Sequence, residues 1–184
     1  MGLIFGFLFP GASATEIAGQ LVGIVAIILG FISYQTKTKR GLLIAQSATA
    51  AVFCLHYGLL GAFSGMAVNA VNIVRNTVYE LTSKNEKAQR WVPIAFVIIQ
   101  CTICCFMWEA WYSVFVLLGQ GISSYCMSFK NPQNVRKSIL VTCPLVLVYD
   151  AFASSIGGII YESVAIVSAI IGIIRNKKPA RGAK

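Results

Sequence analysis

The sequence predicts an all-α membrane protein with seven transmembrane helices, arranged as two parallel three-helix repeats joined by a linker helix (3+1+3). Its N-terminus is expected outside and its C-terminus in the cytoplasm. Two features of composition support this. Apolar types make up 57% of the 184 residues and charged types only 11%, whereas soluble domains carry about 25% charged residues. A soluble fold of this size has too little interior to hide so much apolar surface.

The apolar residues are grouped in seven long runs, and each run predicts one helix. A transmembrane helix needs about 20 residues, and each run supplies close to that length. The runs are continuous rather than alternating, which favours helices over the strands of a β-barrel. The predicted helices span 16–35, 41–61, 64–82, 91–108, 111–129, 137–155 and 158–175.

The first three runs form the predicted first repeat, residues 16–82. Basic residues follow the first run, and the segment 61–65 (Gly-Ala-Phe-Ser-Gly) separates the second run from the third. Gly and Ser permit a helix to end and the chain to reverse sharply. The linker, residues 83–110, contains the fourth run. It is followed by the aromatic segment 108–112, which is expected at the headgroup level, where amphipathic rings are favoured.

The last three runs form the predicted second repeat, residues 111–175. Its turn, Ser154–Gly158, resembles the turn of the first repeat in its Gly and Ser content. Outside the repeats, residues 1–15 form a short apolar segment that is too short to span. We expect it to rest on the outer membrane surface rather than to be a cleaved signal peptide, because it lacks a basic n-region. Residues 176–184 form a basic cytoplasmic tail, whose positive charge also suits contact with anionic lipid.

The basic residues predict the orientation. If there are seven helices, 14 of the 15 Lys and Arg residues fall on one side, in the connections after the first, third and fifth helices and in the tail. Loops rich in Lys and Arg stay in the cytoplasm. A six-helix arrangement would scatter the same charges over both sides. Seven helices with the N-terminus outside are therefore preferred.

Matches between the two halves predict an internal duplication. A three-helix unit is an odd number of spans, so a copy that followed directly would be inverted, and one extra helix restores the orientation; parallel repeats of this kind occur in transporters. At an offset of 93 residues, or 91 for the last pair, the matches are His56-Tyr57 with Tyr149-Asp150, Gly65 with Gly158, Asn69 with Glu162, and Ser33-Tyr34 with Ser124-Tyr125.

Two segments carry a resemblance to known families: 61–65 running on to Asn72-Ile73-Val74-Arg75, and 155–162. With them the whole chain resembles the YgjV family of bacterial inner-membrane proteins, and its 3+1+3 plan resembles the SWEET and PQ-loop superfamily. The resemblance implies a multi-pass protein of the bacterial cytoplasmic (inner) membrane. It also implies substrate contacts on the third and seventh helices. The proline-glutamine pair of PQ-loop proteins is matched only by Pro132-Gln133, in a connection rather than inside a helix.

Polar residues within the apolar runs are the candidate functional residues, because a charge at the bilayer centre costs about 2.5–3.5 kcal/mol on insertion scales. We predict substrate contacts at Asn69, Asn72 and Glu162. Counted from the neighbouring turns, His56, Asn69, Asp150 and Glu162 share one depth, roughly 6–9 Å below the outer surface. The predicted gate or proton-handling residues are His56, Tyr57, Asp150 and Arg75.

Each candidate also has a structural interpretation. Glu162 lies early in its helix, where the helix dipole favours a negative charge. Asp150 can pair with His56 or Arg75, and Arg75 can extend its side chain to the cytoplasmic face. The asparagines can serve as hydrogen bonds between helices. Under these interpretations the residues stabilise the fold and bind nothing.

The preferred hypothesis is a small-solute transporter with a central polar cavity between the repeats. The alternative is a membrane scaffold or accessory subunit without transport activity. An intramembrane enzyme or cofactor protein ranks third, supported only by His56 and the cysteines. We expect no enzyme activity and no cofactor, because catalytic motifs are absent, and no metal site, because there is one histidine. The expected partners are the lipid bilayer and an unknown small solute, with a second copy in a homo-oligomer as a further option, but not nucleic acid.

Overall fold

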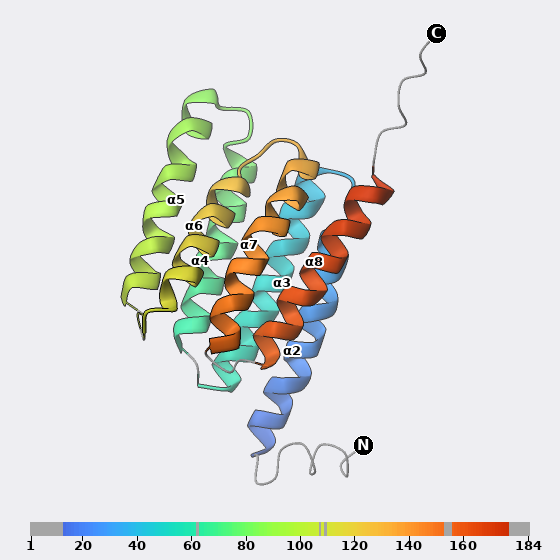
Figure 1. Cartoon of the computed structure of the whole chain (residues 1–184). Helices are drawn as coiled ribbons and strands as arrows, with labels where there is room; N and C mark the ends of the chain where they lie inside the picture. Colours follow the sequence, from blue (N-terminus) through green and yellow to red (C-terminus); the bar gives the residue numbers. More distant parts are fainter. Residues whose placement is uncertain (1–12, 62, 107, 109, 153–155, 177–184) are drawn as a thin grey trace.

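The computed structural model describes residues 13–61, 63–106, 108, 110–152 and 156–176. Most of the predicted N-terminal segment 1–15 and of the tail 176–184 lies outside these residues. Within them, all regular structure is α-helical and comprises seven helices (Figure 1), which confirms the all-α prediction. The helices are α2 (Ala14–Ser33), α3 (Lys39–Leu59), α4 (Phe63–Leu81), α5 (Glu86–Phe106), α6 (Ser113–Cys126), α7 (Pro132–Phe152) and α8 (Ile156–Arg175).

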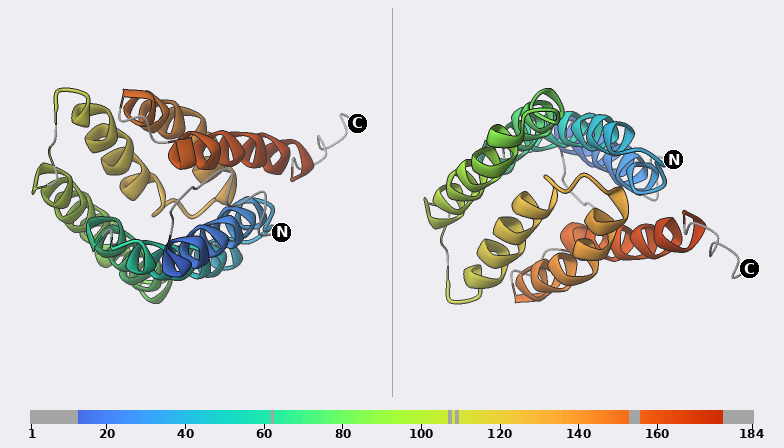
Figure 2. Two further views of the ribbon diagram at one scale, coloured as in Figure 1. Left: turned by 90° about the horizontal axis from the view of Figure 1, so that it is seen from below. Right: turned by 90° about the horizontal axis from the view of Figure 1, so that it is seen from above.

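The helices alternate in direction and enclose a central space. Seen along their axes, α2 to α5 form one curved layer, and α6, α7 and α8 form a second layer that faces it (Figure 2). Each helix packs on its neighbours in the chain, and α8 returns to pack on α2. The packing of α4 on α5 and of α2 on α8 is less extensive than the other contacts. The ring therefore has two less tightly packed seams on opposite sides.

Helix ends differ from the predicted bounds mainly for α5 and α7, which begin at Glu86 and Pro132 rather than at 91 and 137. Polar residues explain both starts. Asn85 Oδ1 accepts from the Ala88 N–H (3.1 Å), and Asn131 Oδ1 accepts from the Gln133 N–H (2.9 Å). A side chain that caps the free N–H groups lets a helix begin outside the apolar run. Hydropathy marks only the part of the helix that suits lipid.

The cap at Asn131 leads to a measurable prediction. The Asn131→Ala variant should lose about 1 kcal/mol of stability, because the first turn of α7 loses an acceptor for its free N–H groups. The free energy of unfolding in mixed SDS micelles measures this loss. Asn134→Ala is the matched control, since Asn134 is exposed within the same first turn. Equal stability of the two variants would show that the cap is not needed.

The outer surface of the ring is apolar. Large hydrophobic side chains on all seven helices are strongly exposed, among them Leu81 (77%), Phe106 (88%) and Ile174 (65%). A continuous apolar surface of this extent suits lipid rather than water. By length and composition, three stretches in the described part of the chain are able to cross a membrane: Lys39–Leu59, Glu86–Phe106 and Gly158–Arg175.

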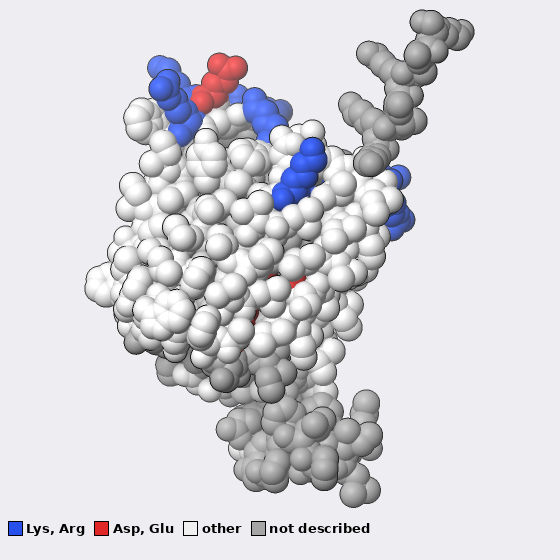
Figure 3. Space-filling model, in the orientation of Figure 1, with Lys and Arg blue, Asp and Glu red and all other residues white. Residues whose placement is uncertain are grey.

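Charged residues gather at one end of the ring. Figure 3 shows the Lys and Arg side chains at the end where α2, α4 and α6 finish, while the visible flank is almost entirely uncharged. We call this the basic end, and it comprises the connections 34–38, 82–85 and 127–131 with the neighbouring helix turns. The opposite end holds the turn after α3, where Gly61 has a φ of 70°. Glycine adopts this left-handed conformation without strain, as the predicted turn at 61–65 requires.

Candidate functional site

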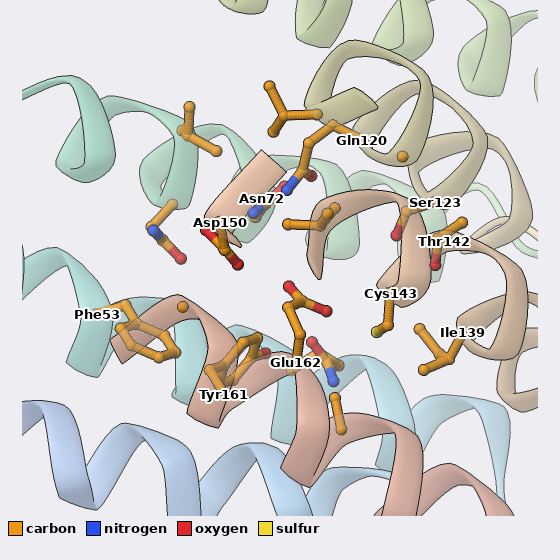
Figure 4. A pocket seen from close by; sticks show the side chains of 18 of the residues that line it. Phe53, Asn72, Gln120, Ser123, Ile139, Thr142, Cys143, Asp150, Tyr161 and Glu162 are labelled. Carbon is orange, nitrogen blue, oxygen red and sulfur yellow. The ribbon is translucent and has the colours of Figure 1, made fainter. Parts of the chain in front are cut away.

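A pocket of about 420 Å³ lies inside the helix ring, lined by residues of α2, α3, α4, α6, α7 and α8. Its size falls within the range of about 300–1,000 Å³ that is typical of small-molecule sites. Asn72, Gln120, Asp150 and Glu162 point into this space from four different helices (Figure 4). The pocket runs from the level of Asp150 toward the basic end.

All seven residues selected from the sequence line this one pocket. Two of them lie on α3, three on α4, one on α7 and one on α8. In chain order they are His56, Tyr57, Asn69, Asn72, Arg75, Asp150 and Glu162. The sequence predicted a common depth for His56, Asn69, Asp150 and Glu162, and the structure brings all seven around a common space. Their roles as solute contacts or gates stay predictions.

Two carboxyl groups occupy the part of the pocket away from the basic end. Asp150 and Glu162 are only 6% and 9% exposed. Asp150 Oδ2 is buried and has no hydrogen-bond partner among the described residues, and the Glu162 carboxyl lies beside the Cys143 thiol. Asp150 packs so closely on α8 that a Cβ atom at Gly158 would lie 2.4 Å from its Oδ1. Glycine at this position thus lets the Asp150 carboxyl reach the pocket wall.

Arg75 lies further along α4, on the same face as Asn69 and Asn72, since residues three apart are neighbours on a helix surface. It is 5% exposed, so it does not extend to the basic end as one interpretation of the sequence required. Its Nε and Nη2 atoms donate to Asn76 Oδ1 at 3.3 and 3.2 Å. Asn72 Oδ1 is buried and has no partner in the described part of the chain. The α4 wall therefore presents donors and acceptors that are incompletely paired.

No ion pair joins the charged groups of the pocket within the described residues. The one salt bridge found there connects Arg40 and Glu80 at 3.5 Å, at the basic end. The interpretation in which Asp150 is neutralised by Arg75 or His56 is therefore wrong for this structure. His56 instead holds α2, with its Nδ1 atom 2.7 Å from the Gly19 carbonyl oxygen. Because a carbonyl only accepts, Nδ1 carries the proton in this contact.

An aromatic wall borders the carboxyl groups. The ring of Phe53 stacks on Tyr57 (centroids 5.9 Å apart) and meets Tyr161 edge-to-face (5.1 Å). The His56 ring packs on Phe53 and Tyr57 and touches the backbone of α2 at Gly23, where a Cβ atom would lie 2.9 Å from the ring. These contacts fix His56 and Tyr57 at one end of the pocket.

Arg136 is a structural residue that the sequence analysis missed. It was counted among the topology charges of a connection, yet it lies inside α7 and its side chain is fully buried (0% exposed). Its Nε atom donates to the Tyr34 carbonyl at 2.7 Å, and its Nη2 atom donates to the Thr36 carbonyl. These are free carbonyl groups at the C-terminal end of α2, which need external donors. The only signal in the sequence was Asn131-Pro132, a helix start five residues earlier.

Other contacts at the basic end also join helices across the ring, as the contact of Arg136 with the end of α2 does. The Lys39 ammonium at the start of α3 donates to the Met127 carbonyl at the end of α6, and the Tyr79 hydroxyl donates to the Ser124 carbonyl at 2.9 Å. Gln35 adds a bond from α2 to the Ser168 carbonyl on α8 (2.9 Å). Since Tyr34 and Met127 also line the pocket, these contacts bound it toward the basic end. We call them the basic-end clamps.

The cysteines and the other metal-ligating side chains do not form a cluster in the part of the chain that the structure describes. The six cysteines are free thiols. No group of three or more His, Cys, Asp or Glu side chains in these residues is arranged to hold a metal ion. The polar groups that line the pocket are amides, hydroxyls, two carboxyls, one guanidinium, one imidazole (His56) and one thiol (Cys143). Such a set suits recognition of a polar solute by hydrogen bonds and charge.

Comparison with known proteins supports the membrane assignment. The model of a family described as a bacterial inner membrane protein, Imp-YgjV, matches residues 17–179, which is most of the chain. This match confirms the resemblance to the YgjV family, while the resemblance to SWEET and PQ-loop proteins stays a prediction. No curated protein and no solved structure matches the sequence. The matched region contains all seven candidate residues.

Proposed function

We propose that this protein, which belongs to the Imp-YgjV family of bacterial inner membrane proteins, carries a small polar solute across that membrane through its pocket. The observation that carries the proposal is the convergence of Asp150, Glu162 and Arg75 on one space without pairing with each other. Ionisable residues are expensive within a bilayer and typically mark substrate or ion pathways there. Packing alone is served by apolar residues at lower cost.

Burial in the two halves supports the proposed 3+1+3 repeat. The buried residues of α3 are Leu42, Leu43, Thr49 and Ala50. At the offset of 93 residues found in the sequence, these positions correspond to Val135, Arg136, Thr142 and Cys143 on α7, all of which are buried as well. Equivalent burial in corresponding helices is the pattern expected of a duplicated three-helix unit. In this proposal, α5 is the linker helix.

The proposed transport cycle uses the two groups α2–α4 and α6–α8 as units that rock against each other. The less extensive contacts of α2 with α8 and of α4 with α5 are the natural seams for such a motion. The basic end faces the cytoplasm, as the charge distribution favours, and the basic-end clamps close the pocket on that side. His56, Tyr57 and Asp150 lie toward the opposite end, where they control access from outside.

Uptake into proteoliposomes tests the proposal. Purified protein is reconstituted and offered a panel of labelled solutes: sugars, polyols, amino acids, organic acids and amines. We expect uptake of at least one class above that of protein-free liposomes. The Glu162→Gln variant should reduce this uptake at least ten-fold, because it removes a charge from the pocket and leaves the side-chain volume nearly unchanged. Glu86→Gln is the matched control, since Glu86 is exposed at the start of α5.

The same experiment separates the transporter from an accessory subunit. An accessory subunit would give no uptake of any solute, and its pocket substitutions would lower folding yield instead. Stable copurification of another membrane protein would then favour that alternative. Uptake that Glu162→Gln and Glu86→Gln leave equally intact would overturn the role of the pocket.

A further inference from the structure

We infer that the solute is bipolar, with a cationic group held by the carboxyl groups of Asp150 and Glu162 and an anionic group held by Arg75, as in a free α-amino acid. The inference rests on the proposed function and names the chemical class of its solute. It follows from the arrangement of the three charges: they line one pocket, carry opposite signs and lack ion-pair partners in the described chain.

The carboxyl end of the pocket suits an ammonium group. Asp150 Oδ2 is buried without a hydrogen-bond partner among the described residues, and Glu162 points into the same space (Figure 4). An ammonium group offers three donors, which match carboxylate oxygens on α7 and α8 and the unpartnered Asn72 Oδ1 on α4. The aromatic rings of Phe53, Tyr57 and Tyr161 lie at the same end, and such rings attract cations that approach their faces.

The Arg75 end suits a carboxylate. A guanidinium group carries five N–H donors in a planar fork that matches a carboxylate in a bidentate contact. In the described structure the Arg75 guanidinium donates to one residue, Asn76, at the long distances of 3.2 and 3.3 Å. A buried charge without a counter-ion is unfavourable. An anion from the solute would supply that counter-ion without displacing an existing ion pair.

The spacing along α4 and α8 sets the separation of the two ends. Asn69 and Glu162 each lie six residues after the first residue of their helices, α4 and α8, which begin at the same end of the ring (Figure 1). Arg75 lies six residues further along α4, which corresponds to about 9 Å of helix rise. Two charge-assisted hydrogen bonds of about 2.8 Å take up more than half of that distance. The short remainder fits a solute whose charges are separated by a few bonds, as the amino and carboxyl groups of an α-amino acid are.

Neutral groups line the region between the two ends. Gln20, Gln46, Gln120, Ser123 and Thr142 add amides and hydroxyls to the lining. The volume of about 420 Å³ leaves space for a side chain in addition to the charged groups. The inference therefore specifies the backbone of the solute and leaves its side chain open.

Matched sets of analogues test the inference on the full-length protein. Labelled alanine, leucine, serine and glutamine are each compared with the corresponding amide, which lacks the carboxylate, with the corresponding carboxylic acid, which lacks the ammonium group, and with a polyol of similar size. Binding to the detergent-purified protein and uptake into proteoliposomes are measured separately. We expect at least one amino acid to bind and to be taken up at least ten-fold better than its singly charged analogues, because a site built for a polar group rejects analogues that lack it.

Charge-neutralising variants locate the two ends. Arg75→Gln should remove the preference for the amino acid over its amide, and Glu162→Gln should remove the preference over the carboxylic acid. The controls are Arg90→Gln and Glu86→Gln, at exposed positions of α5. If Arg75→Gln does not fold, Arg75→Lys retains the charge but not the fork, and it should weaken that preference without abolishing it. The wild-type comparison of analogues needs no variant.

The outcomes separate this inference from the proposed transport function. Amino acids that bind in an Arg75-dependent way but do not cross the membrane would support the bipolar site and overturn transport. Uptake of a polyol or a singly charged solute in preference to every amino acid, lost in Glu162→Gln, would support transport and overturn the bipolar solute. A protein that neither binds nor takes up any amino acid of the set would overturn the inference as well.

Discussion

The Arg136→Met variant is expected to lose about 2–4 kcal/mol of stability, because each buried polar group left without its partner costs about 1–3 kcal/mol. The Tyr34 and Thr36 carbonyls, just after α2, would lose the hydrogen bonds that the Arg136 guanidinium donates to them. Methionine fills much of the same volume and offers no N–H group, so the loss reports the hydrogen bonds rather than a cavity. The free energy of unfolding in mixed SDS micelles, followed by tryptophan fluorescence, measures the effect.

Lys137→Met is the matched control for this prediction. Lys137 is the next residue on α7, carries the same charge and is exposed. Its replacement should leave stability within about 0.5 kcal/mol of wild type, as for most surface substitutions. Equal stability of the Arg136→Met and Lys137→Met variants would show that Arg136 is only a topology charge, as the sequence suggested.

The Gly172→Ala variant should be similarly destabilised, by about 1–3 kcal/mol, because added volume in a tightly packed contact forces its surroundings apart. A Cβ atom at this position would lie 2.4 Å from the Tyr34 carbonyl oxygen and 2.8 Å from Arg136 Nε. The carbonyl belongs to the backbone directly after α2, so it moves only if the end of α2 and α8 separate. The separation would also lengthen the bond between Arg136 and Tyr34. The same unfolding measurement applies.

Gly58→Ala is the control for Gly172→Ala. Gly58 is also a helical glycine, but its nearest contact for a Cβ atom is the flexible Met66 side chain at 3.5 Å, an ordinary distance. Alanine is favoured over glycine in a helix by about 0.5–1 kcal/mol, so this variant should be as stable as wild type or more so. In addition, the double variant Arg136→Met/Gly172→Ala should lose less than the sum of the single losses, because both changes break the same contact. Strict additivity would contradict a shared clamp.

Most of the helix architecture was predictable from the sequence. The seven apolar runs correspond to the seven helices in the described residues, and the largest differences are the polar starts of α5 and α7. A run of apolar residues reflects the free energy of transfer to lipid, which is a property of each segment by itself. Where the helix continues past the run depends on a cap such as Asn85 or Asn131, a weaker signal than hydropathy.

The candidate site was predictable in membership but not in pairing. His56, Asn69, Asp150 and Glu162 were selected because polar groups at one depth in a bundle tend to share a space. Whether Asp150 would pair with Arg75, and whether Arg75 would extend toward the basic end, depended on distances between helices that a sequence does not contain. Arg136 was missed for the same reason, since a basic residue near the end of a run is usually a topology charge.

By itself, the sequence determined that this protein is a bundle of apolar helices with its basic residues on one side, because composition, run length and charge position act locally along the chain. Only the tertiary structure decided that Arg136 turns inward to bind the end of α2, that Gly172 gives it room, and that Arg75 meets no carboxylate among the described residues. The physical reason is that a long charged side chain near a helix end can place its charged group either in solvent or against the backbone of a neighbouring helix. The packing of helices distant in sequence selects between them.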